Sequence, residues 1–475
     1  MPTTDRRPAA PPRLTPRDWG VLFVLCGAIF LEGVNVAMLG VALPAIRADL
    51  GLTTGELQWV LGAYVLGYGG FMLAGGRAAD LFGRRRMFLT WLAVFLVVSA
   101  LGGMAGEGWL LIAARFVAGV AAAVMTPAGL SIITTGFEEG PRRNQALLVY
   151  SGTASGGFSL GLVLGGLLTA VDWRLTLIVP AVLALIILVA AVPLIPRNEP
   201  ERARGRVDVL GAVTITAAVM LLVLGVERAA HAGGASTAAA IGAGLALVAV
   251  FAAIERRSPA PLLRLGILRS WPLVRANLVG LLFLGAFFGF QFIVVLYLQE
   301  LRGWSPLQTS LALLAVGVDA VLAPLVTPWL VNRYGNPRVI LAGLLLAVLS
   351  YALFLPIGPD TAYLAMFPTM IILGVGFALV YGPLTIAATD GVAEHEQGLA
   401  GGLLYTSFQF GSALGLAAAT AVIVAATAGT APGDMAGLLG GHRAALAVPV
   451  AATILGAAIS VIGLRRRTAE PSAGA

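Results

Sequence analysis

Runs of about 20 mainly apolar residues recur along the whole chain and constrain its fold more than any other feature. A helix of about that length crosses the hydrocarbon core of a bilayer, which is roughly 30 Å thick. The composition agrees, because 59% of the 475 residues are hydrophobic and only 11% are charged. Soluble domains average roughly 45–50% apolar and about 25% charged residues. The sequence therefore predicts an all-α polytopic membrane protein.

The apolar runs number fourteen and fall into groups of six, two and six. They lie near residues 19–44, 57–76, 87–106, 109–133, 145–170, 175–195, 209–226, 237–254, 273–299, 307–330, 338–357, 361–386, 399–425 and 444–464. The two central runs are the shortest. We expect an N-terminal six-helix bundle and a C-terminal one, with two inserted transmembrane helices between them. The expected divisions are 1–18 (tail), 19–195 (first bundle), 196–272 (linkers and inserted helices), 273–464 (second bundle) and 465–475 (tail).

Arginine accounts for all 30 basic residues, and its distribution predicts the orientation. With fourteen spans, the side that holds both termini carries 24 arginines and the opposite side carries five, while Arg115 lies within a span. Positive residues mark cytoplasmic loops. We therefore expect a multi-pass protein of the cell membrane with both termini in the cytoplasm. The net charge of +7 then lies beside anionic lipid head groups, and nucleic acid is not expected as a partner.

Several functional classes are disfavoured by what the sequence lacks. Cys26 is the only cysteine, and His231, His395 and His442 are far apart in polar loops, so we expect no metal site. The chain has no G-x-x-x-x-G-K-S/T loop, which disfavours an ATP-driven pump. Its loops are too short for a soluble catalytic domain. We expect no enzyme activity, no cofactor and no obligate protein partner.

A short polar segment is repeated at a fixed distance in the two halves. Asp80, Phe82, Gly83 and Arg86 are each followed 252 residues later by Asn332, Tyr334, Gly335 and Arg338. Internal repeats are common in transporters, where two bundles move around a site near the middle of the membrane. The repeat therefore indicates two related six-helix halves.

The first copy of this segment resembles the loop signature of the major facilitator superfamily, G-x-x-x-D-x-x-G-R-R/K. Gly83 permits a tight reversal, and Asp80 can cap a neighbouring helix N-terminus. The arginines can pair with acids or lipid phosphates. This resemblance implies the major facilitator fold, and it assigns the segment to conformational switching. The residues expected to act in the switch are Gly76, Asp80, Gly83, Arg84 and Arg86.

Other segments resemble the 14-spanner drug:proton antiporters of that superfamily. Leu111, Arg115 and Gly119 match the fourth-helix motif, although Ala118 replaces the frequent glutamine. Gly157, Gly161 and Gly165 match the antiporter motif of span five, although Leu162 replaces its proline. The remaining matches are Asn35 to Pro44 (with Asn35 in place of aspartate), Asp172-Trp173-Arg174, Tyr297-Leu298-Gln299 and Gly303-Trp304-Ser305-Pro306. The glycine stripe of span five, and a similar one at Ser407, Gly411 and Gly415, indicates close helix packing first and a hinge second.

Three ionisable residues lie at membrane depth, where a charge costs roughly 2.5–3.5 kcal/mol on insertion scales. Glu32 shares a helix face with Asn35, and a carboxyl in a low-dielectric cavity can exchange a proton near neutral pH. Glu32 is therefore the expected proton carrier; the alternative is a purely structural Glu32–Arg115 pair. Asp319 matches no family motif. It is a candidate for a second proton site or for a site that binds a cationic substrate. The alternative is that it faces a water-filled vestibule.

Aromatic and amide side chains in spans one, two, nine and thirteen are the candidates for binding a bulky amphipathic ligand. Plain helix packing is the alternative for each. The candidates are Asn35, Tyr64, Tyr68, Phe287, Gln291, Tyr405 and Gln409, with Phe288, Phe290 and Phe408 beside them.

We therefore expect a proton-coupled antiporter that exports amphipathic drugs or other toxic small molecules. An exporter of one endogenous metabolite or lipid is the nearest alternative. A membrane-embedded enzyme or receptor is a remote one.

Overall fold

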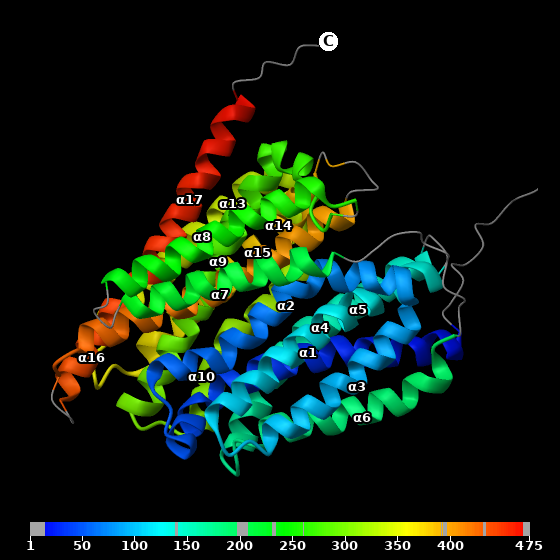
Figure 1. The fold of residues 1–475 in the computed structure, drawn as a ribbon. Helices are drawn as coiled ribbons and strands as arrows, with labels where there is room; N and C mark the ends of the chain where they lie inside the picture. Colours follow the sequence, from blue (N-terminus) through cyan, green and yellow to red (C-terminus); the bar gives the residue numbers. More distant parts are fainter. Residues whose placement is uncertain are drawn as a thin grey trace, which may run out of the picture.

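The computed structural model describes residues 15–137, 141–196, 208–229, 234–259, 261–390, 392, 397–430 and 434–468. Every regular element in these ranges is a helix. Figure 1 shows α1 and α3 to α6 on one side of the molecule and α13 to α17 on the other, while α7 lies over the boundary between the two groups. The all-α expectation is confirmed.

The N-terminal half consists of six long helices, as the sequence predicts. They are α1 (Pro16–Leu50), α2 (Thr54–Phe82), α3 (Arg84–Gly103), α4 (Gly108–Gly136), α5 (Pro141–Thr169) and α6 (Leu175–Leu194). Capping boxes begin α1 at Thr15 and α2 at Thr53, where a side-chain oxygen accepts a bond from an otherwise unpaired backbone N–H. Gly51 follows α1 with φ 65° and Gly83 follows α2 with φ 93°, conformations that glycine adopts without the steric cost of a Cβ.

The two inserted helices form a hairpin, α7 (Val209–Ala229) and α8 (Gly234–Arg257). Helix α7 contacts both α2 and α15, which belong to different halves, whereas α8 packs mainly against α7. The short 3-10 helix η1 (Leu265–Arg269) leads into the C-terminal half. The hairpin therefore covers a boundary between the halves.

The C-terminal half is less regular than the N-terminal half. Its elements are α9 (Trp271–Leu296), the π-helical turn η2 (Tyr297–Leu301), α10 (Pro306–Leu313), the 3-10 turn η3 (Leu314–Val318), α11 (Asp319–Leu325), α12 (Thr327–Tyr334), α13 (Asn336–Phe354), α14 (Tyr363–Thr389), α15 (Gln397–Thr427), α16 (Met435–Ala445) and α17 (Ala447–Thr468). The sequence predicted one span over 307–330, but this region is divided into α10, η3, α11 and α12. Asp319 stands at the first position of α11.

Thirteen helices in the described residues are long and apolar enough to cross a membrane. In α5 the apolar stretch among the described residues is Gly156–Thr169, which is shorter than the thirteen candidate spans. Large apolar side chains such as Phe23, Val189 and Leu364 are exposed on the outer surface, as a lipid-facing surface requires. The chain is therefore a multi-pass membrane protein.

The glycine stripe of α5 packs directly on α1. A Cβ at Gly157 would lie 2.7 Å from the carbonyl oxygen of Phe30, and one at Gly165 would lie 2.7 Å from the Cα of Met38. Gly161 meets Val34 in the same way. In the C-terminal half Gly411 packs on Leu281 and Gly415 on Gly285, so α15 meets α9 as α5 meets α1. Packing, the first interpretation of both stripes, is therefore present in both halves.

Candidate functional site

Glu32 lies on α1 between the two halves of the molecule. It is half-buried, although its neighbours Leu31, Val34 and Asn35 are fully covered. Its carboxyl interacts electrostatically with tyrosines from four other helices, two in each half. They are Tyr64 and Tyr68 (α2), Tyr150 (α5), Tyr381 (α14) and Tyr405 (α15). Glu32 is thus a half-covered acid in a ring of tyrosines from both bundles.

Arg115, on α4, is 2% exposed and forms a different pair from the one that the sequence suggested. Its Nη1 donates to Asn35 Oδ1 at 3.0 Å and its Nε donates to the carbonyl oxygen of Val60 at 3.4 Å. Its guanidinium carbon lies 4.4 Å from the ring centroid of Tyr64. No salt bridge between Glu32 and Arg115 is present in the described part of the chain. Asn35, and not Glu32, is therefore the α1 partner of Arg115, because the Asn35 side chain points toward α4.

The arginine network also explains the fourth-helix motif. Gly119, one turn beyond Arg115, packs against the carbonyl of Tyr64 with no room for a side chain. This close approach brings α4 near enough to α2 for the guanidinium to reach Val60 and Tyr64. Asn35 is completely buried and its oxygen is occupied by Arg115, so the geometry gives this candidate substrate residue a structural position.

A cluster of aromatic rings faces this region from the C-terminal half. Tyr381 stacks on Phe377 with centroids 5.2 Å apart and on Phe408 with centroids 5.1 Å apart. Tyr405 contacts both Tyr381 and Phe408, and Phe287 contacts Phe377 at 4.8 Å. The sequence analysis did not select Phe377 and Tyr381. Their spacing of four residues, which places two rings on one face of α14, is the signal that could have found them.

The other candidate substrate residues are distributed unequally around Glu32. Tyr64, Tyr68 and Tyr405 are near enough to be affected by its charge. Gln291 and Gln409 are half-buried, and Gln409 lies at the contact with α2, where a Cβ at Gly69 would meet it at 2.7 Å. Phe290 instead packs on Tyr351 and Phe354, and therefore belongs to the core between α9 and α13.

Asp319 is half-buried and interacts electrostatically with Tyr381, the tyrosine that Glu32 also reaches. The repeat explains the broken helix around it. Gly374 packs on the carbonyl of Val316 as Gly119 packs on Tyr64, and residues 316 and 64 are 252 apart. At the same offset Asp319 replaces Gly67, whose bare backbone touches Phe116 of α4. A side chain cannot make that close contact, and the helix is interrupted by η3 at this point.

The turn between α2 and α3 has the shape predicted from the loop signature. Gly83 and its counterpart Gly335 have φ values of 93° and 81°, so both copies make the same reversal. Arg85 anchors the turn to α6, since its Nε donates to the carbonyl of Ile195 at 2.9 Å and its Nη2 to that of Val192 at 2.7 Å. The backbone of Asp80 is helical, but its side chain lies outside the described residues. A Cβ at Gly76 would make only ordinary contact with Pro127, and the signature residues Arg84 and Arg86 lie in the first turn of α3.

An ion pair that the sequence analysis missed joins the two halves at the end of α1. Arg47 Nη1 contacts the Glu300 carboxylate at 3.1 Å, and Gln299 Nε2 donates to the carbonyl of Val41 at 2.9 Å. Gln299 is the last residue of the Tyr297-Leu298-Gln299 motif, and Glu300 follows it directly in η2. A Cβ at Gly166 of α5 would meet the backbone of Leu307 of α10 at 2.8 Å. The halves are therefore in close contact on the side of the α1–α2 turn.

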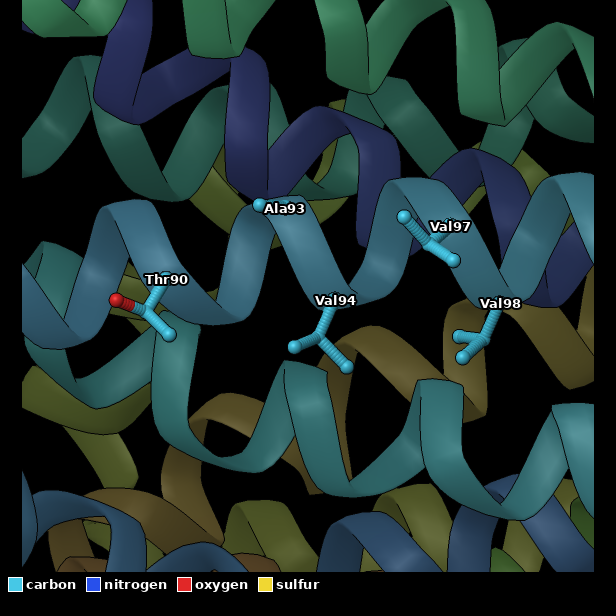
Figure 2. Close-up of a pocket in the computed structure, with 5 residues that line it drawn as sticks. All are labelled: Thr90, Ala93, Val94, Val97 and Val98. Atoms are coloured by element: carbon cyan, nitrogen blue, oxygen red, sulfur yellow. The ribbon is translucent and has the colours of Figure 1, made fainter.

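Figure 2 shows a depression on α3 that is lined by side chains of that helix alone. Its lining is Thr90, Ala93, Val94, Val97 and Val98. None of these side chains is charged, and α3 contributes none of the tyrosines around Glu32. The depression therefore belongs to the apolar outer surface.

The molecule has two related six-helix bundles and an acid among tyrosines between them. This is the architecture of a two-bundle membrane transporter. The profile of the Major Facilitator Superfamily matches residues 25–416. The chain belongs to this superfamily.

Relatives of similar length include antibiotic export and resistance proteins. A cephamycin export protein of Amycolatopsis lactamdurans is 36% identical over 90% of this chain and 89% of its own. A puromycin resistance protein of Streptomyces alboniger is 35% identical, with 95% and 92% covered. A multidrug efflux pump of Mycolicibacterium smegmatis is 29% identical, with 88% and 81% covered.

Solved structures show the same fold at low sequence identity. A bacterial homologue of the human lysosomal transporter Spinster, in an inward-facing and unoccupied conformation, aligns with a TM-score of 0.69 at 16% identity over 95% of this chain and 98% of its own. A peptide transporter in complex with sulfate gives a TM-score of 0.68 at 18% identity, with 94% of each chain covered. The expected two-bundle fold is confirmed.

Proposed function

We propose that this chain is a secondary transporter that exports amphipathic drugs or other toxic small molecules across the cell membrane in exchange for protons. The export direction is supported by the relatives, whose names describe antibiotic export, resistance and efflux. The observation that carries proton exchange is Glu32, a half-covered acid among tyrosines of both bundles.

Glu32 suits this coupling because its charge is costly where it lies. When no substrate is bound, a proton neutralises the carboxyl; when a substrate occupies the same space, the proton is displaced. The rings of Tyr381, Phe377 and Phe408 offer an apolar wall opposite the acid, and such a surface with few polar groups suits bulky amphipathic ligands. Arg115 and Asn35 brace α1 against α4 and so fix the acid's position.

Alternating access follows from the contacts between the bundles. The Arg47–Glu300 pair and the Gln299–Val41 bond close the side of the α1–α2 turn, and they must break for that side to open.

We propose fourteen crossings, with α5 as the additional one, and both termini in the cytoplasm. The arginine asymmetry supports this orientation, which places Arg47 and Glu300 at the outer face. Labelling of a cysteine at position 205 from outside the cell would contradict it.

Transport by the purified protein in proteoliposomes tests the proposal. An imposed pH gradient should drive substrate uphill, and collapse of the gradient with a protonophore should stop it. Transport that is independent of the pH gradient would contradict proton coupling and indicate a uniporter or coupling to another ion. Liposomes without protein provide the baseline.

A dedicated exporter of one compound is the second candidate, because two of the relatives are named for a single antibiotic each. Growth of expressing and empty-vector cells on chemically varied toxic compounds separates the two. Protection against several unrelated amphipathic compounds indicates a multidrug exporter, whereas protection against one compound alone indicates the dedicated exporter.

A further inference from the structure

Two carboxyl groups meet at the base of the inserted α7–α8 hairpin, on helices that do not contribute to the ring around Glu32. Asp208 immediately precedes α7, and its Oδ1 accepts a hydrogen bond from the Gly211 N–H at 2.7 Å. Glu255 lies in the last turn of α8 and is only 4% exposed. Its Oε2 accepts a hydrogen bond from the Leu263 N–H at 3.0 Å. Each carboxyl is therefore fixed through one of its two oxygens.

The second oxygen of each carboxyl is buried and lacks a partner. Asp208 Oδ2 and Glu255 Oε1 make no hydrogen bond in the described part of the chain, although the two groups interact electrostatically. They converge on Gly211, where a Cβ would lie 2.8 Å from Glu255 Oε1 and 3.2 Å from Asp208 Oδ1. The missing side chain of Gly211 provides the space in which the carboxyls approach each other.

The chemistry of this pair fits a proton better than a metal ion. Two charged carboxylates that share a buried site repel each other, and one proton removes the repulsion. Ca²⁺ takes about six to eight oxygen ligands and Mg²⁺ about six, whereas the described residues leave two carboxyl oxygens open here. The arginines on the surrounding described elements are Arg77 of α2, Arg228 of α7, Arg256 and Arg257 of α8, Arg264 of the linker and Arg269 of η1, and all six are exposed.

We propose that Glu255 holds a proton beside the Asp208 carboxylate and forms a second protonation site, separate from Glu32. The bond from Leu263 ties the linker after α8 to this pair. The adjacent Leu262 packs with Ala74 of α2 and Ala212 of α7 in one small apolar cluster. Helix α7 in turn contacts α2 and α15 of opposite bundles. Loss of this proton from Glu255 places two negative charges together and loosens the base of the hairpin from α2, so the site makes this contact sensitive to pH on the face that we assign to the cytoplasm.

The test measures how readily a thiol at position 262 reacts. Leu262→Cys is introduced into full-length protein carrying Cys26→Ala, and its maleimide labelling rate is measured from about pH 5 to about pH 9. The same rate is measured with Glu255→Gln added. The glutamine amide stays neutral at every pH and so mimics the protonated carboxyl of Glu255. Dividing the two rates removes the pH dependence of the thiol itself.

The ratio should be close to one at acidic pH and should rise severalfold at alkaline pH, where only the protein with Glu255 loses the proton. Asp208→Asn, which removes the neighbouring negative charge, should move the rise to higher pH. Asp390→Asn, which alters an exposed acid at the end of α14, should leave the rise intact. A ratio that stays at one throughout would overturn the proposal. A ratio that EDTA changes would overturn it too, because the ligand would then be a cation.

A second measurement uses protein with the native Leu262. The melting temperatures of wild type and Glu255→Gln should diverge as the pH rises, with the wild type becoming the less stable. A difference that is independent of pH would contradict a proton on Glu255, whatever the labelling shows.

Discussion

At the scale of single residues, the two charged side chains Arg115 and Glu32 have different surroundings in the interior. Arg115 is fully enclosed and its donors are directed at Asn35 and Val60, while Glu32 is half-covered and faces tyrosines. A buried cation with fixed partners holds helices together. An acid whose neighbours are neutral hydroxyls and rings can gain and lose a proton without breaking an ion pair, and this difference supports the proposal that Glu32 carries the coupling.

The arginine network predicts a loss of stability when Arg115 is truncated. Arg115→Ala leaves the buried oxygen of Asn35 without its donor, and an unsatisfied buried group costs about 1–3 kcal/mol. The melting temperature of the purified protein should fall, and Asn35→Ala should add little to it because both changes remove the same bond. Additive losses in the double variant would contradict a direct Arg115–Asn35 interaction.

At the scale of helices, glycine positions decide which pairs approach closely. Gly157, Gly161 and Gly165 each touch the backbone of α1, whereas Gly156 has no atom near the position of a Cβ. Gly161→Val should therefore destabilise the protein by about 1–3 kcal/mol through overpacking. Gly156→Val on the same helix is the matched control and should be close to neutral. Equal melting temperatures for the two variants would show that the α1–α5 contact is looser than described.

Much of the helical architecture could be predicted from sequence, because apolar length and glycine spacing are local properties of the chain. The two halves and the close packing of α5 follow from such patterns. The partner of Arg115 could not be predicted, since Glu32 and Asn35 share one face and only the rotation of α1 against α4 selects between them. The aromatic cluster of Phe377 and Tyr381 depends in the same way on how α14 meets α15. The interruption at Asp319 could not be predicted either, because it depends on how closely its counterpart Gly67 approaches α4.

At the scale of the whole molecule, the two bundles are joined by few polar contacts at the side of the α1–α2 turn. Arg47→Glu places two acids together there and should shift the protein toward opening on that side. The double variant Arg47→Glu/Glu300→Arg restores opposite charges and should restore the wild-type balance. Reaction of a cysteine at Ser310, which packs beside Gly166, with a water-soluble thiol reagent reports the opening. Faster labelling that persists in the double variant would assign the effect to something other than the ion pair.

The central claim is that protons and substrate compete at Glu32. Proton release on addition of substrate to purified protein in weakly buffered solution measures this competition directly. Wild-type protein and Asp319→Asn should release protons, whereas Glu32→Gln, which still binds substrate, should release none because an amide does not titrate in this range. Full release from Glu32→Gln together with none from Asp319→Asn would contradict the account and place coupling at α11.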